Sequence, residues 1–204
     1  WKTFLVLLKG NSVSAYLKSI CTLMNFANFI LFNDSPIQSH LWYLGAILYV
    51  LLIMVVLSRF YLMKIVFILT PILLIGDIVF GKYSVLLFGR EFPIIFVRNF
   101  LFVGIPYFTI GMGIRWLIKS GRTVSVKGML ILIFVFSTTT VLERFFLITV
   151  HANATRDHYI STTFLTIAVF MFFIEKYKGR KIGKLEKTVA MLGQKYSIGV
   201  YIIH

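Results

Sequence analysis

The sequence predicts an all-α, polytopic transmembrane helix bundle that forms one membrane domain over residues 1–204. Composition is the first reason. Hydrophobic residues make up 59% of the chain and charged residues 14%, and the mean hydropathy is +0.90, which leaves too little polar surface for a water-soluble domain. The second reason is that the apolar residues fall in runs, because a helix of roughly 20 apolar residues crosses a bilayer core about 30 Å thick.

Five clear apolar runs are each long enough to span with some tilt: residues 41–57, 65–80, 94–117, 129–150 and 159–174. A sixth span is expected over residues 189–204, although Gln194, Lys195 and Ser197 interrupt it. Residues 14–32 are apolar but dotted with polar side chains such as Lys18 and Asn25, which indicates either an interfacial helix or a polar-lined span. We therefore expect about six to seven spans.

Positive charge dominates the chain, which carries 21 Lys and Arg against 7 Asp and Glu and has a net charge of +14. In a soluble protein this excess would suggest nucleic acid, but here the basic residues lie mainly between the apolar runs. Cytoplasmic loops retain Lys and Arg, so the links within 115–127 and 176–187 are expected inside the cell. Residues 33–40, 81–93 and 151–158 then lie outside. The basic links act as topology determinants, and no nucleic-acid partner is expected.

Ionisable and amide side chains near the span ends are the candidate functional residues, because each costs several kcal/mol in hydrocarbon unless it is paired or hydrated. The orientation above places all of them in the outer half of the membrane, where His158 also falls. They suit a cavity open to the outside, in which a carboxylate orients a hydroxyl and an arginine neutralises an anion. Alternatively, Arg98 forms a buried ion pair with Glu143 or Asp77. The residues are Asp77, Arg98, Asn99, Glu143 and Arg144, together with His40 and His204.

The third span carries Gly104, Pro106, Gly111 and Gly113, which predict a kinked helix that packs closely on its neighbours or lines a substrate path. Trp42 opens a span and is either an interface anchor or a substrate-stacking residue. No Walker loop, GxSxG, HExxH or paired CxxC motif occurs, so no metal is expected. The lone Cys21 cannot form an internal disulfide.

Three phrases resemble the acyltransferase-three family of bacterial membrane O-acyltransferases. SHLWYL at 39–44 resembles the entry to a central span of the family, RNFLFVGIPYF at 98–108 resembles its RNFLF-x-G-x-P-F-F stretch, and LGQKYSIGVYIIH at 192–204 resembles its last span. The branch with HLWYL also resembles the membrane halves of vancomycin-resistance serine racemases and biofilm-polysaccharide modifying proteins.

The resemblance implies a membrane domain of about ten helices in the bacterial plasma membrane. It also implies transfer of an acyl group from cytoplasmic acetyl-CoA, or another acyl-CoA, to a hydroxyl of an extracytoplasmic glycan or other cell-envelope acceptor. The catalytic histidine on the family's first span, and the basic motif that follows it, have no match here. Because the chain also begins at Trp1, it looks like the carboxyl-terminal two-thirds of a longer protein, whose amino-terminal spans would be its partner in the membrane.

On this resemblance Glu143 orients or deprotonates the acceptor, and Arg98 acts beside it. The remaining residues are assigned to substrate binding: Asn99, Arg144, His40, Trp42, Asp77 and His204. A transporter or flippase for a polar metabolite or lipid-linked sugar has the same features, namely charged residues within the membrane, a broken helix and a cavity open to the outside, and stays open as an alternative. A non-catalytic assembly partner is the third class.

Overall fold

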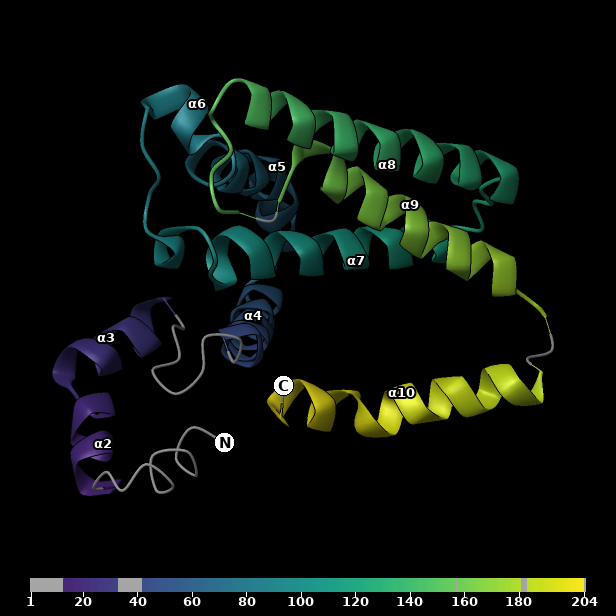
Figure 1. Cartoon of the computed structure of the whole chain (residues 1–204). Coiled ribbons are helices and arrows are strands. Elements are labelled where there is room, and N and C mark those ends of the chain that lie inside the picture. The colour runs from purple at the N-terminus through teal and green to yellow at the C-terminus, as the bar shows by residue number, and fades with distance from the viewer. Residues whose placement is uncertain (1–12, 33–41, 157, 181–182, 204) are drawn as a thin grey trace. The chain divides into compact units, whose positions relative to one another are not determined.

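The computed structural model describes residues 13–32, 42–156, 158–180 and 183–203. Over these ranges the chain is helical and contains no strand, which confirms the predicted fold class. Among the described residues, five helices are long and apolar enough to cross a membrane, and Figure 1 labels each of them. They are α4 (Trp42–Arg59), α5 (Met63–Phe80), α7 (Ile105–Lys119) with the short η3 before it, α8 (Val126–Thr149) and α9 (Ile160–Tyr177).

The five spans face outward for the most part. Only 6% to 22% of the residues in each span are buried inside the protein. In water such exposure of Leu, Ile and Phe would drive aggregation, whereas lipid tails are as apolar as these side chains. The chain is therefore a multi-pass membrane protein.

Residues 43–176 form one compact unit, here called the helix unit. The other unit combines the chain up to Trp42 with Tyr177–His204. It contains α2 (Val13–Ile20), α3 (Leu23–Phe32) and α10 (Lys184–Ile203). Each unit is described by itself below.

The segment 14–32 is not one continuous helix but two short ones, α2 and α3, which separate at Cys21 and Thr22. The Asn25 side chain donates to the carbonyl oxygens of Ile20 and Ser19, at 2.9 and 3.2 Å, and so satisfies the end of α2. Neither helix reaches the length of roughly 20 residues that a span needs. Neither helix alone is therefore long enough to span, and the choice between an interfacial segment and a polar-lined span stays a prediction.

Helix α10 begins at Lys184, five residues before the expected span, and is not among the membrane-crossing helices of the described chain. Its first turns contain Lys184, Glu186 and Lys187, which lower its hydropathy together with the polar residues at 194–197. At 20 residues α10 is long enough to span, so its composition, not its length, keeps the sixth expected span from being among the five candidates.

Three helices of the helix unit meet in a small apolar core. Val50 and Met54 of α4, Val66 of α5 and Ile105 of α7 are all buried and pack together. Gly104 permits this approach, because a Cβ atom there would lie 2.7 Å from Cγ2 of Val50. The close packing predicted for this part of the third span is thus confirmed at Gly104, whereas Gly111 has open space beside it.

The third span begins at Phe100, not at residue 94 as the apolar run suggested. Between α5 and this span the chain forms α6 (Ser84–Phe88) and the 3-10 turn η2 (Ile94–Phe96). Asn99 is extended, and its Oδ1 accepts hydrogen bonds from the amides of Leu101 and Phe102 at 2.9 and 3.1 Å. This cap starts η3 (Phe100–Gly104), a π-helical turn that continues directly into α7, with Pro106 in its first turn.

We expect Gly104→Ala to destabilise the helix unit by about 1–3 kcal/mol, because its new methyl group must displace Val50 from the core. The apparent melting temperature of the purified protein in detergent measures this effect. Gly111→Ala on the same helix is the matched control, since nothing lies within 4 Å of its added Cβ. Equal melting temperatures for the two variants would contradict the packing described here.

Candidate functional site

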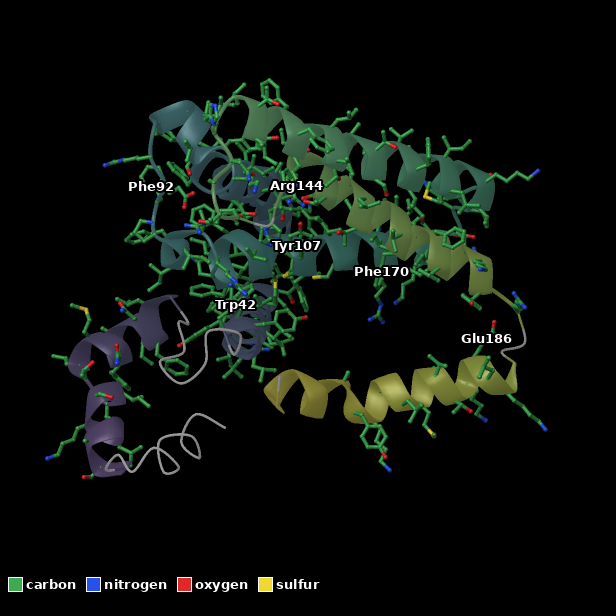
Figure 2. The ribbon with its side chains drawn as sticks, in the orientation of Figure 1. Trp42, Phe92, Tyr107, Arg144, Phe170 and Glu186 are labelled. Carbon is green, nitrogen blue, oxygen red and sulfur yellow. The ribbon has the colours of Figure 1, made fainter. Side chains whose placement is uncertain are left out.

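Two links that are distant in sequence meet at one end of the helix unit. One joins α5 to η3 and the other joins α8 to α9. The Thr155 amide and hydroxyl donate to the two carboxylate oxygens of Glu91 at 2.9 and 2.6 Å, and a guanidinium nitrogen of Arg156 donates to the carbonyl of Phe92. Figure 2 shows Phe92 on the segment that follows α6. We call this part of the helix unit, residues 77–99 and 143–163, the loop end.

The contacts at the loop end bear on topology. Helix alternation placed residues 81–93 and 151–158 on one side of the membrane, and the contacts place both links at one end of the unit. The link between α7 and α8 lies at the other end, because α7 starts at the loop end and crosses away from it. Which end faces the cell exterior stays a prediction from the Lys and Arg distribution.

Lys82 is buried at the loop end, with 4% of its surface exposed. Its ammonium donates to the carbonyl oxygen of Ala154 at 2.8 Å and lies 4.6 Å from the ring centroid of Tyr159. A carbonyl dipole and an aromatic face offset part of the cost of burying the charge. Lys82 therefore ties the start of α6 to the segment that leads into α9.

Asp77 and His158 form a hydrogen-bonded pair near the end of α5. The Nδ1 atom of His158 lies 2.8 Å from Oδ2 of Asp77, and the two side chains are 35% and 8% exposed. Tyr107 projects from α7 toward α9 (Figure 2), and its ring lies 5.8 Å from the imidazole, measured between centroids. Its hydroxyl is 3.1 Å from Oγ1 of Thr163. Asp77 thus finds its partner in a histidine of the α8–α9 link.

Glu143 caps the start of α9 from the neighbouring helix α8. Its carboxylate accepts hydrogen bonds from the amide of Ile160 at 2.8 Å, from the amide and hydroxyl of Ser161 at 3.3 and 2.6 Å, and from the hydroxyl of Tyr83. Thr140, one turn earlier on α8, lies 2.7 Å from Ser161 between hydroxyl oxygens. Burial, followed by the Glu143 hydrogen bond, raises the pKa of Tyr83, which therefore stays a neutral donor.

The other sequence-predicted site residues lie in different settings. Asn99 is buried and caps η3, while Arg98 beside it is half-buried. Arg144 is exposed on α8, next to Glu143. Trp42 is half-buried at the first position of α4 and belongs to the other unit. His40 and His204 lie outside the described residues. The loop end as defined above thus contains Asp77, Arg98, Asn99, Glu143 and Arg144, and the observed side-chain partner of Asp77 is His158.

Sequence patterns did not single out Lys82, Tyr83, Tyr107, Ser161 or the pairing of His158. The two members of the Asp77–His158 pair are 81 residues apart, and neither carries a local motif. A usable signal did exist. Asp77 lies near the end of the second apolar run and His158 lies directly before the fifth, so both are predicted on the same side of the membrane. Pairing the ionisable residues of equal predicted depth would have proposed this contact.

The chemistry available at the loop end is proton transfer and hydrogen bonding. A carboxylate bound to Nδ1 of an imidazole is the arrangement of a general base, and the ring of Tyr107 lies beside that imidazole. Other hydroxyl groups of the loop end are already hydrogen-bonded, that of Tyr107 with Thr163 and that of Ser161 to Glu143. No group of three or more His, Cys, Asp or Glu that could hold a metal occurs among the residues that the structure describes.

Comparison of the chain with protein-family models, with curated proteins and with solved structures gives no match. The resemblance to membrane acyltransferases therefore depends on the three sequence phrases.

We expect Glu143→Gln to cost about 1–3 kcal/mol of stability, because an amide NH₂ group cannot accept the donors that both carboxylate oxygens now bind. Thermal unfolding in detergent provides the measurement. In a double-mutant cycle with Tyr83→Phe the two losses should be less than additive, since they share one contact. Glu186→Gln is the control: its carboxylate accepts one exposed backbone hydrogen bond, from Gly183, so a change within about 0.5 kcal/mol is expected.

The contact between Glu91 and Thr155 should weaken in acid. The hydroxyl of Thr155, followed by its amide, lowers the pKa of Glu91 from the ordinary 4.5. The stabilisation is therefore present above the ordinary value and is lost as the pH falls through the lowered one. Hydrogen exchange of the Thr155 amide, corrected for its intrinsic pH dependence, should rise over that interval. Glu91→Gln should remove the dependence. An identical acid response in the variant would exclude Glu91 as its cause.

Proposed function

We propose that the protein is a membrane-bound O-acyltransferase that transfers an acyl group, most simply acetyl, from a cytoplasmic acyl-CoA to a hydroxyl of an extracytoplasmic glycan or other cell-envelope acceptor. The observation that carries this proposal is the loop end itself. In a helix unit that is otherwise lipid-facing, the Asp77–His158 pair, the Glu143 network and several hydroxyl groups gather at one end. The three acyltransferase-like phrases supply the reaction class.

The two ends of the helix unit suit the two substrates of this reaction. Acyl-CoA carries several phosphate charges, and the link at the far end from the loop end contains the exposed Arg115, Lys119, Arg122 and Lys127. A polar acceptor with hydroxyl groups would instead meet the hydrogen-bonding side chains of the loop end. This arrangement keeps the charged donor on the cytoplasmic side and the glycan on the other.

Glu143 has a positioning role in this proposal. Its oxygen atoms already accept four hydrogen bonds, which fix the start of α9 and hold Tyr83. Because these donors occupy both carboxylate oxygens, Glu143 is assigned to positioning and not to proton transfer. Asn99 likewise fixes the beginning of the third span. Arg98 and Arg144, which flank these two residues in sequence, are the cations proposed to attract an anionic acceptor or to stabilise the oxyanion of the transition state.

Inside-out membrane vesicles from cells that express the full-length protein test the function directly. Radiolabelled acetyl-CoA added to the exposed cytoplasmic face should label the enclosed envelope polysaccharide, and mild alkali should release the label as acetate. Vesicles from cells that lack the gene set the background. Label at background level would refute the proposal. Uptake of an unmodified sugar or lipid-linked sugar without acetyl transfer would instead support a transporter or flippase.

A further inference from the structure

We infer that His158, held by Asp77, removes the proton from the acceptor hydroxyl, an inference that rests on the proposed acyl transfer and assigns to this chain a base in addition to the first-span histidine of the family that it resembles. The supporting observation is geometric. Asp77 lies on α5 and His158 in the link before α9, 81 residues apart in sequence, and the two side chains meet with 2.8 Å between Nδ1 and Oδ2. No sequence pattern assigned either residue to proton transfer.

The carboxylate decides which imidazole nitrogen is basic. A carboxylate oxygen accepts a hydrogen bond, so Nδ1 of His158 carries the proton in the neutral ring. Nε2 then holds the lone pair that can accept a proton. The Asp77 charge also stabilises the imidazolium that forms when Nε2 takes a proton from the acceptor.

The two side chains of the pair differ in exposure, as expected for a general base and the group that orients it. The side chain of Asp77 is 8% exposed and sits on the long helix α5, whereas that of His158 is 35% exposed in the link before α9. The orienting group is thus held inside the protein and the proton acceptor is reachable. Tyr107 lies against the imidazole, with 44° between the ring planes, and its hydroxyl meets Thr163. These contacts limit the orientations that the histidine ring can take.

Glu143 and Lys82 help to position this pair. Glu143 binds the amides of Ile160 and Ser161, which follow His158 by two and three residues. Lys82 holds Ala154 on the other side of the same link. The segment that carries the histidine is therefore fixed at both ends by buried or half-buried polar groups.

The step balances without any further reactant. The acceptor oxygen forms a bond with the acyl carbonyl carbon while its proton passes to Nε2 of His158. The bond between that carbon and its leaving atom, a sulfur in a thioester, then breaks. The proton moves from Nε2 to the leaving atom, which restores the neutral imidazole and releases the ester and the thiol.

The first test is acetyl transfer in the vesicle assay above. His158→Asn keeps an N–H donor near the position of Nδ1 for Asp77 but removes Nε2, so transfer should fall at least 100-fold, within the range that general base catalysis contributes. Asp77→Asn should lower it about 10-fold or more. His151→Asn is the matched control, because His151 is exposed and has φ 52°, a conformation that asparagine tolerates. Melting temperatures show whether each variant is folded.

The second test does not depend on catalysis. Diethyl pyrocarbonate transfers an ethoxycarbonyl group to a neutral imidazole nitrogen, and mass spectrometry follows His158 and His151 in the same full-length molecule. At a pH of about 8.5, where an ordinary imidazole is neutral, Asp77→Asn should slow modification of His158 at least three-fold and leave His151 unchanged.

The outcomes separate the inference from the function on which it rests. Vesicles with an inactive wild-type protein would refute the acyltransferase proposal and, with it, the role of the base. An active wild type with folded His158→Asn protein that transfers acetyl within three-fold of the His151→Asn control would overturn the base alone. An Asp77→Asn variant with an unchanged or faster rate at His158 would show that Asp77 does not activate the imidazole, and would overturn the pair.

Discussion

The carboxylate of Glu143 is the constraint on which the loop end depends. A charge at this depth is costly unless donors surround it, and here Tyr83, Ile160 and Ser161 supply them from two other segments. Two of the donors are the amides of Ile160 and Ser161, which open α9 and so have no carbonyl partner within that helix. The contacts with Glu143 therefore supply hydrogen-bond acceptors to backbone amides that would be costly to leave unpaired near lipid. The position of α9, and of the histidine just before it, follows from this one group.

The helix unit divides its stabilising interactions by depth. Around Gly104, cohesion comes from close packing with a few apolar side chains of α4, α5 and α7, since lipid offers no hydrophobic driving force for helix association. Toward the loop end, hydrogen bonds and the cation–π contact of Lys82 take over. Such polar contacts are directional, so they fix the relative positions of α5, α8 and α9 more specifically than apolar contacts between smooth helices can.

Apolar runs and composition in the sequence correctly predicted the fold class. They also predicted the first and last residues of four of the five spans to within a few residues. The start of the third span was missed, because Asn99 captures the amides of Leu101 and Phe102 and so begins the helix inside an apolar run. The break at Cys21 between α2 and α3 also left no hydropathy signal. That Asp77 and Glu143 lie at the same end of the helices was predicted, but their partners were not, since contacts such as Tyr83 with Glu143 depend on tertiary packing.

The links of the loop end impose an order on biosynthesis. Lys82 needs the carbonyl of Ala154, which is made 72 residues later, and Glu91 needs Thr155, which is made 64 residues later. At a synthesis rate of about 5–20 residues per second, the first link waits several seconds before its partner leaves the ribosome. During that interval the ammonium of Lys82 and the carboxylate of Glu91 depend on water or on the insertion machinery. The two links can therefore lock together only after the chain has been made as far as Thr155.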